Sequence, residues 1–149
     1  MTLVVIDTNV VVSGLLAATA GSPTARILDA MADGTLHCIL SDDLLAEYRA
    51  VLLRTAIAAR HGLSEAEVDA VLEGIVANAG WREPAGAPAD LTSAHPGAVA
   101  PGDEHVLALL EAEPRAVLVT GDRGLRDSVA AWRTALTPAE LVARFAAES

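Results

Sequence analysis

The chain has 149 residues, of which 52% are hydrophobic, and a formal net charge of −10. This length and apolar content predict one folded domain over residues 1–149 and exclude an intrinsically disordered chain. The ten basic residues are all arginine, so the sequence lacks the broad basic surface of a non-specific nucleic-acid binder. The one cysteine, Cys38, excludes an intrachain disulfide and favours a reducing compartment, for which we expect the cytoplasm.

The N-terminal apolar run has no basic residue before it and is interrupted by Asp7 and Asn9. Both features argue against a secretion signal. No uncharged apolar stretch reaches the roughly 18 residues that cross a bilayer. We therefore expect no association with a membrane.

The first part of the chain is expected to alternate between strand and helix. Residues 3–6 form a β-branched and leucine run, which is typical of a strand buried on both faces. Ser22 is expected to cap a helix over 24–32, with a proline at its first position. The apolar run over 36–40 predicts a second strand.

The middle of the chain predicts two further helices and a long loop. Ser41 is expected to cap a helix that carries Glu47 and continues past Leu53. Another helix is predicted over 64–79, with a serine and a glutamate in capping-box spacing at its start. Residues 82–102 are rich in proline, glycine and alanine, which predicts either a variable insertion or a substrate-facing loop, with room for a short strand near Val99.

The last part of the chain predicts a helix over 103–111, a buried strand over 116–120 and a short helix over 125–131. Thr137 and Glu140 have the spacing of a capping box that opens a C-terminal helix. This alternation predicts an α/β fold with a mostly parallel central sheet flanked by helices in three layers.

Two of the expected strands end in the same way. Asp7 directly follows the first strand, and Asp122 comes two residues after the strand over 116–120. In open parallel sheets ligands bind at the carboxyl ends of the strands, so both aspartates lie where sites are usually built. A turn or helix-cap aspartate is the ordinary interpretation of either residue alone. Their repetition on comparable strands favours a functional role.

Asp103 and Glu47 are the other acidic candidates. Helical spacing places Asp103 in the middle of an apolar stripe, where a charge is costly unless it is paired or binds a metal. Backbone N–H groups at a helix start are an equally good partner for it. Glu47 lies at the edge of the buried face of its helix, which also fits a solvated glutamate or a salt bridge to Arg49 or Arg54.

Clustered carboxylates repel one another unless a cation neutralises them, and hard oxygen ligands suit Mg²⁺ or Mn²⁺. Such ions can stabilise the attacking and leaving oxygens of a phosphodiester and activate a water molecule. A protein nucleophile is then unnecessary. This agrees with a sequence in which no Ser/His/Asp or Cys/His arrangement is apparent.

Five segments spread over nearly the whole chain, in this order, carry a family resemblance: VVIDTNVVVSGLL, SDDLLAEYRAVLLR, PGDEHVLALLEA, VLVTGDRGL and LTPAELVARF. Asp-Thr-Asn after an N-terminal buried strand, combined with Val-Thr-Gly-Asp near the C-terminus, is a fairly specific pairing, whereas either motif alone is weak. The order of these motifs resembles the PIN-domain nucleases. More narrowly, it is similar to the toxin components of bacterial toxin–antitoxin pairs.

The resemblance implies a PIN domain that acts as a metal-dependent endoribonuclease on RNA. It implies that four acids hold Mg²⁺ or Mn²⁺ and are the catalytic residues: Asp7, Glu47, Asp103 and Asp122. It further implies four supporting polar residues that orient carboxylates or the metal's waters: Thr8, Asn9, Ser41 and Thr120. A homodimer and inhibition by a cognate antitoxin protein are also implied.

Two other interpretations stay open: a PIN domain that only binds, and a nuclease acting on DNA or structured RNA outside a toxin–antitoxin system. The presence of all four acids argues against the first, and a small acidic chain argues against the second. A phosphatase of the haloacid-dehalogenase type would need an aspartate where Asn9 stands, and a receiver domain would need a lysine. Related sequences often carry a further aspartate where this chain has Ala100, which could weaken one metal site.

Some remaining residues have competing interpretations. Arg123 and Arg126 closely follow Asp122 and could meet phosphate oxygens, although a solvated helix face fits them equally well. Trp81 and Trp132 are expected to be packing residues, with RNA stacking as an alternative for Trp81. Three histidines match no common zinc-ligand spacing: His61, His95 and His105.

Overall fold

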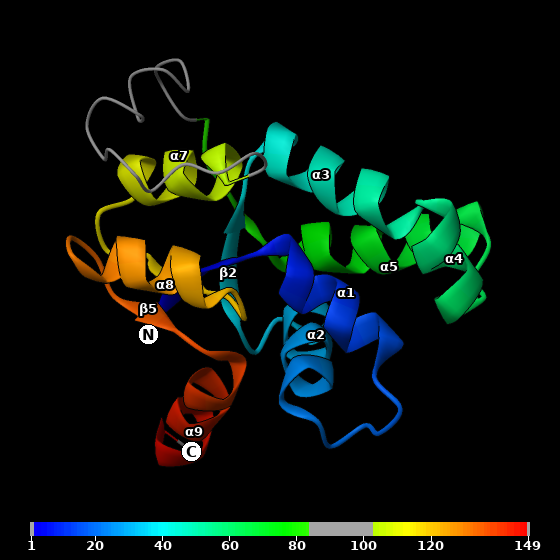
Figure 1. Cartoon of the computed structure of the whole chain (residues 1–149), viewed down its shortest axis with the longest axis horizontal. Coiled ribbons are helices and arrows are strands. Elements are labelled where there is room, and N and C mark those ends of the chain that lie inside the picture. Colours follow the sequence, from blue (N-terminus) through cyan, green and yellow to red (C-terminus); the bar gives the residue numbers. More distant parts are fainter. Residues whose placement is uncertain (1, 84–102, 149) are drawn as a thin grey trace.

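The computed structural model describes residues 2–83 and 103–148. Its sheet has five parallel strands in the order β3–β2–β1–β4–β5, with helices on both faces (Figure 1). The strands are β1 (Leu3–Ile6), β2 (His37–Leu40), β3 (Gly80–Trp81), β4 (Val117–Val119) and β5 (Ala135–Leu136). The predicted three-layer α/β fold is confirmed.

The helices of the described residues surround this sheet (Figure 1). They are α1 (Thr8–Leu16), α2 (Pro23–Asp33), α3 (Asp42–Leu52), α4 (Thr55–His61), α5 (Glu65–Asn78), α7 (Glu104–Ala112), α8 (Arg123–Ala130) and α9 (Pro138–Glu148). None of them combines the length and the apolar character that crossing a membrane requires.

The central strand β1 determines where a site can form. It pairs in parallel with β2 on one side and with β4 on the other. The chain builds β2 and β3 outward in one direction, then returns to place β4 and β5 in the other. The gap between β1 and β4 is therefore the topological switch point, where the loops leave the sheet in opposite directions and open a crevice at the carboxyl ends of the strands.

The core explains why β1 and β4 are continuous apolar runs. The side chains of Val4, Val5 and Ile6 are fully buried, and those of Leu118 and Val119 are too. A strand that is covered by helices on both faces has no solvent-facing side, so alternating polar residues would be unfavourable on it. The rigid pair of strands presents the residues that follow it to solvent at one edge.

Several predicted helix starts are confirmed by hydrogen bonds. The Ser22 and Ser41 hydroxyls accept from the backbone three residues ahead, as N-caps do. Ser64 and Glu67 form the reciprocal hydrogen bonds of a capping box. Thr137 and Glu140 form a second capping box. The first turns of these helices are therefore specified locally by the sequence.

Other expectations were wrong or lie outside the described residues. The helix expected to continue past Leu53 ends at Leu52, and a separate helix α4 begins at Thr55, because the intervening Arg54 has an extended backbone with ψ 137°. Helix α1 was not anticipated, since its run of valines favours a strand by propensity. The strands β3 and β5 are two residues long and were also missed. The strand expected near Val99 falls outside the described residues.

The close approach of α1 and α2 at Gly14 yields the first prediction. A Cβ atom at Gly14 would lie 2.6 Å from the backbone oxygen of Thr24 and 3.0 Å from the Cβ of Leu28. Alanine normally favours a helix over glycine, but here the steric conflict should dominate. We expect Gly14→Ala to lower the free energy of unfolding by about 1–3 kcal/mol in a urea denaturation experiment.

The matched control for this prediction is Gly21→Ala. A Cβ at Gly21 meets no atom within 4 Å, so we expect a change within about 0.5 kcal/mol. Equal effects of the two substitutions would contradict the assigned contact between α1 and α2.

Candidate active site

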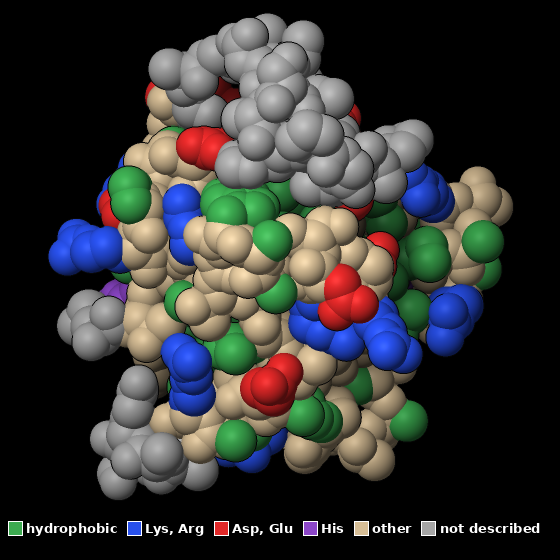
Figure 2. Space-filling model, turned by 60° about the vertical axis from the view of Figure 1, so that its left-hand side comes forward, with side chains coloured by type: hydrophobic (Ala, Val, Ile, Leu, Met, Phe, Trp, Pro, Cys, Tyr) green, Lys and Arg blue, Asp and Glu red, His purple; other side chains and the backbone are tan. Residues whose placement is uncertain are grey.

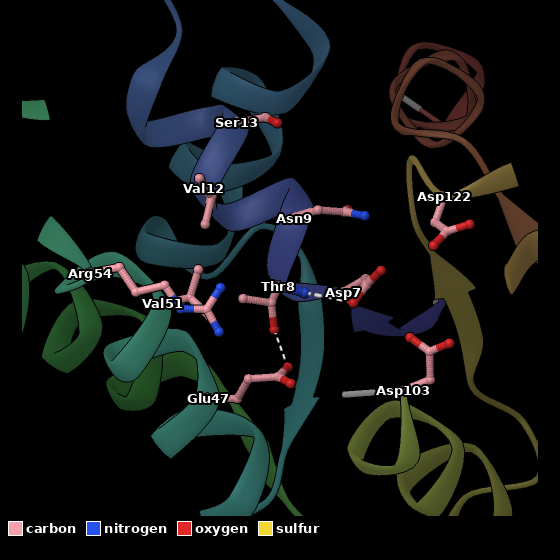
Figure 3. A pocket seen from close by; sticks show the side chains of 10 residues that line it. All are labelled: Asp7, Thr8, Asn9, Val12, Ser13, Glu47, Val51, Arg54, Asp103 and Asp122. Carbon is pink, nitrogen blue, oxygen red and sulfur yellow. Dashed lines mark hydrogen bonds between the residues drawn. The ribbon is translucent and has the colours of Figure 1, made fainter. Parts of the chain in front are cut away.

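An open cleft of about 390 Å³ lies where β1 and β4 end (Figure 3). All four predicted acids line it, although they come from widely separated parts of the chain. Its complete lining is Asp7, Thr8, Asn9, Val12, Ser13, Glu47, Val51, Arg54, Asp103 and Asp122. The fold thus gathers carboxylates from the end of β1, from α3 and from the starts of α7 and α8.

Asp7 is the most buried of these acids and is held at both oxygens. It is the N-cap of α1, and its side chain is only 8% exposed. Its Oδ1 accepts from the backbone N–H of Thr8 at 2.9 Å, and its Oδ2 accepts from the Thr120 hydroxyl at 2.6 Å. These hydrogen bonds fix the direction in which the carboxylate faces the cleft.

Burial raises the pKa of Asp7 above its ordinary value, because desolvation penalises the charged form. The hydrogen bonds from Thr120 and Thr8 oppose this rise, and the nearby charges of Glu47 and Asp122 add to it. The net upward direction means that the protein itself does not fully compensate the Asp7 charge. A cation in the cleft would compensate it.

The Thr120 hydroxyl connects the two motifs that the sequence singled out. Thr120 is fully buried, and besides donating to Asp7 its Oγ1 accepts from the backbone N–H of Asp122 at 3.0 Å. The Asn9 side chain spans the same gap, because its Nδ2 lies 3.5 Å from the Thr120 Oγ1 and its Oδ1 accepts from Gly121 N–H at 3.4 Å. The Asp-Thr-Asn and Thr-Gly-Asp segments therefore form one hydrogen-bonded unit.

Asp122 caps α8 with one oxygen. Its Oδ1 accepts from the backbone N–H of Leu125 at 3.1 Å, and the residue is otherwise exposed. In Figure 3 the carboxylate faces the cleft on the same side as Asp103. The ordinary interpretation of a helix-cap aspartate is thus correct for Asp122, and it is compatible with a place in the cleft.

Helix α3 brings Glu47 to the cleft through two contacts with the β1–α1 segment. The Thr8 hydroxyl donates to Glu47 Oε2, and the hydroxyl of the next residue, Tyr48, donates to the backbone carbonyl of Ile6. Tyr48 is fully buried, and this burial raises its pKa well above the ordinary value, so its hydroxyl stays a donor. The two neighbouring side chains on α3 thereby contact the two residues that flank Asp7.

The alternative of a salt bridge for Glu47 does not describe this structure. Arg49 instead pairs with Asp69 at 2.8 Å and with Glu65 on α5. Within residues 2–83 and 103–148, Arg54 forms no ion pair with Glu47 either. Glu47 therefore lines the cleft as a carboxylate that accepts from Thr8 and has no ion pair within the described residues.

Asp103 lies at the junction that leads into α7. It occupies the N-cap position, but its side chain makes no capping hydrogen bond to the helix, and it lines the cleft opposite α1 (Figure 3). The alternative interpretation, in which backbone N–H groups of this helix satisfy the carboxylate, is therefore wrong. Asp103 directly precedes α7, whose buried apolar residues pack in the core, and this position brings Asp103 to the cleft.

The donor set of the cleft fits a hard divalent cation, since all four acids are oxygen ligands. Within the described ranges, no three acidic, histidine or cysteine side chains converge closely enough to bind one ion directly. Mg²⁺ retains several waters and is usually held by only one or two carboxylates. An open arrangement of acids therefore suits Mg²⁺ better than it suits an ion that needs protein ligands on all sides.

Four predicted site residues are not part of the cleft lining: Thr120, which reaches the site through Asp7, and Ser41, Arg123 and Arg126. Ser41 is buried and its hydroxyl caps α3. Arg123 is exposed and lies 3.8 Å from Asp127, and Arg126 donates to the Thr120 backbone oxygen at 3.2 Å. Their predicted roles as supporting or substrate-binding residues stay predictions.

Among the aromatic and histidine candidates, Trp132 packs against the core, as expected. Trp81 is 37% exposed and its Nε1 donates to Glu83, so both interpretations of this residue, packing and RNA stacking, stay predictions. The His61 ring hydrogen-bonds the backbone at the α4 boundary, which is a structural role. His95 lies outside the described residues.

Two polar residues of the cleft lining, Ser13 and Arg54, were not predicted from the sequence. Ser13 follows Asn9 by one helical turn on α1, a relation that could only be seen once 8–16 was assigned as a helix. Arg54 was considered only as a partner of Glu47. Its place depends on the break between α3 and α4.

The raised pKa of Asp7 predicts an unusual effect of pH on stability. Because the folded pKa lies above the unfolded one, the folded protein binds the proton more tightly, and stability falls as pH rises through this window. Asn keeps the oxygen that accepts from Thr8 N–H and removes the charge, but it puts an NH₂ donor where Oδ2 accepts from the Thr120 hydroxyl, a loss that does not depend on pH. We therefore expect the Tm of metal-free Asp7→Asn in EDTA, relative to that of the wild type, to increase as pH rises from about 4 to neutral.

Asp33→Asn is the control with the opposite sign. Hydrogen bonds from Thr35 lower the pKa of Asp33, so its charge stabilises the fold above the ordinary carboxyl range. Its removal should lower Tm at neutral pH. If the Tm of Asp7→Asn relative to the wild type also decreased as pH rises, the uncompensated charge assigned to Asp7 would be disproved.

Three solved structures share this fold. PAE2754 from Pyrobaculum aerophilum is 18% identical with a TM-score of 0.65, over 98% of this chain and 90% of that one. FitAB bound to an IR36 DNA fragment is 18% identical with a TM-score of 0.55, over 91% and 94% of the two chains. FitAcB from Neisseria gonorrhoeae is 20% identical with a TM-score of 0.55, over 91% and 97%.

No curated protein sequence is similar enough to this chain to be called a relative. A family profile described as the PIN domain, however, matches residues 3–124, which include all four acids of the cleft. The match covers most of the chain and agrees with the parallel sheet and the motifs that end β1 and β4. The chain belongs to the PIN-domain family.

Proposed function

We propose that this protein is a metal-dependent endoribonuclease that hydrolyses RNA phosphodiester bonds and serves as the toxin of a toxin–antitoxin pair. The observation that carries the proposal is the convergence of four acids from separate segments on one cleft at the switch point of the sheet. Membership of the PIN-domain family supports nuclease activity in general. The ion, the substrate and the partner are parts of the proposal.

Asp7, Glu47, Asp103 and Asp122 are the proposed ligands of Mg²⁺ or Mn²⁺, directly or through water. When bound, the divalent ion would neutralise charge on the phosphodiester and lower the pKa of a water molecule, so that this water could lose a proton and attack the phosphorus. The chain's own part is to orient the ligands: Thr120 holds Asp7, Thr8 holds Glu47, and Asn9 ties the two motifs together.

The charge distribution supports a nuclease that holds its substrate within the cleft. On the face shown in Figure 2, arginine side chains form separate patches, several of them beside acidic side chains. With a net charge of −10, the chain has little long-range attraction for a polyanion. Binding at a metal-occupied cleft resolves this difficulty, because the ions reverse the local field.

The partner and the choice of RNA rest on the resemblance to toxin components. The similar structure of FitAB is bound to a DNA fragment, which keeps a DNA-directed nuclease as the alternative substrate class. A cognate antitoxin protein is the proposed regulator. Homodimer formation and a cytoplasmic location stay predictions.

The proposal predicts cleavage of a mixed single-stranded RNA with Mn²⁺ or Mg²⁺ and none with EDTA. Asp7→Asn and Asp103→Asn should each lower the rate at least a hundredfold, because each removes a charged ligand. Asp29→Asn is the matched control, since Asp29 is exposed on α2 and away from the cleft. Metal-independent cleavage, or equal loss in all three variants, would contradict the proposal.

Two outcomes of the same assay distinguish the alternatives. Cleavage of single-stranded DNA at a higher rate than RNA would support the DNA-directed nuclease. No cleavage of either by folded, antitoxin-free protein that still binds Mn²⁺ would support a non-catalytic binding domain.

The Thr120 hydroxyl provides a further test of how the ligands are oriented. Thr120→Val keeps the volume but leaves Asp7 Oδ2 and Asp122 N–H without their hydrogen-bond partner. We expect Mn²⁺ affinity to fall about 10–100-fold, as for other residues that hold a metal ligand. Thr120→Ser keeps the hydroxyl and should bind Mn²⁺ nearly as the wild type does. An equal loss in both variants would assign the effect to packing.

A further inference from the structure

Arg54 is the one positively charged side chain in the described lining of the cleft. It stands between α3 and α4, and in Figure 3 its guanidinium points into the cleft from the side opposite Asp103 and Asp122, with Thr8 and Glu47 between. The cleft therefore has two ends of different character. One end is formed by aspartates, and the other carries a cation.

The hydrogen-bond donors of Arg54 are not used within the described part of the chain. Its side chain forms no ion pair or hydrogen bond there, and it does not cap α4. Most other arginines are engaged by carboxylates or backbone carbonyls: Arg49, Arg82, Arg115, Arg123, Arg126 and Arg133. Glu47, the nearest candidate acid in the sequence, accepts from Thr8 instead.

An unpaired guanidinium facing a cleft is suited to one kind of ligand group. Its planar donors match the oxygens of a phosphate and can contact two of them at once. Metal ions at the aspartate end would neutralise the phosphate that is cleaved. A neighbouring phosphate of the same strand would otherwise meet only the negative field of this chain.

We propose that Arg54 binds a phosphate adjacent to the scissile one, so that the cleft recognises two phosphates of a nucleic-acid strand, one at the acidic end and one at Arg54. This inference rests on the proposed nuclease function and adds to it a substrate-binding residue.

The test measures binding of a fluorescein-labelled single-stranded RNA by anisotropy, with Ca²⁺ in place of the catalytic ion and at several salt concentrations. We expect Arg54→Ala to weaken binding about tenfold or more, the size of a lost charged hydrogen bond. We also expect the slope of log K against log salt to become shallower by about 0.7, the value for one phosphate contact on a single strand. Arg54→Lys should restore the slope and part of the affinity.

Arg60→Ala is the matched control, because Arg60 is an exposed arginine on α4 that does not line the cleft. It removes the same charge and should change affinity less than twofold. Cleavage kinetics with Mn²⁺ give a second readout: Arg54→Ala should raise KM and leave kcat nearly unchanged, as expected when a contact is equal in ground and transition states. Mn²⁺ binding and the Tm of Arg54→Ala should match the wild type.

The outcomes separate this inference from the proposed function. If wild-type protein neither binds nor cleaves RNA, the proposed function fails, and this inference fails with it. If wild-type protein binds and cleaves RNA while Arg54→Ala behaves like Arg60→Ala, only the role of Arg54 is overturned. A fall in kcat or in Mn²⁺ affinity, with the salt slope unchanged, would equally overturn phosphate binding by Arg54.

Discussion

The parallel pairing of β1 with β4 is the constraint on which the cleft depends. It brings the carboxyl ends of two buried strands together and places the segments that follow them within hydrogen-bond reach. The Thr120 hydroxyl then joins Asp7 to the backbone of Asp122. A shift in this register by one residue would turn the Thr120 side chain to the other face relative to Asp7, so the site depends on this alignment.

The carboxylates that the fold brings close to Asp7 repel its negative charge. Burial and the neighbouring acids raise the pKa of Asp7, which means that the fold disfavours the charged form of this carboxyl group. Tyr48 and Thr8 provide the contacts that keep α3 and Glu47 in place. The structure thus holds a group of carboxylates in fixed positions, a preorganisation suited to a divalent cation. Arg54 at the opposite end of the cleft is suited to a phosphate of a nucleic-acid strand.

Much of the fold and the acidic set could be predicted from local signals. Apolar runs indicate β1, β2 and β4, and four serine or threonine caps begin their helices where expected. The valine-rich α1 was missed because its propensity favours a strand, and its helix is specified instead by the Asp7 cap and by packing against α2. The break after Leu52 was missed because it contains neither glycine nor proline.

The amino-acid sequence alone determined the strands β1, β2 and β4, the starts of the capped helices, the family resemblance and the identity of the acids, since apolar periodicity, capping residues and short motifs are local properties. Only the tertiary structure decided that Thr120 links Asp7 to Asp122, that Ser41 itself does not line the cleft, and that Arg54 faces the cleft. Such relations join atoms up to 113 residues apart, and no local pattern encodes the direction in which a side chain points across that separation.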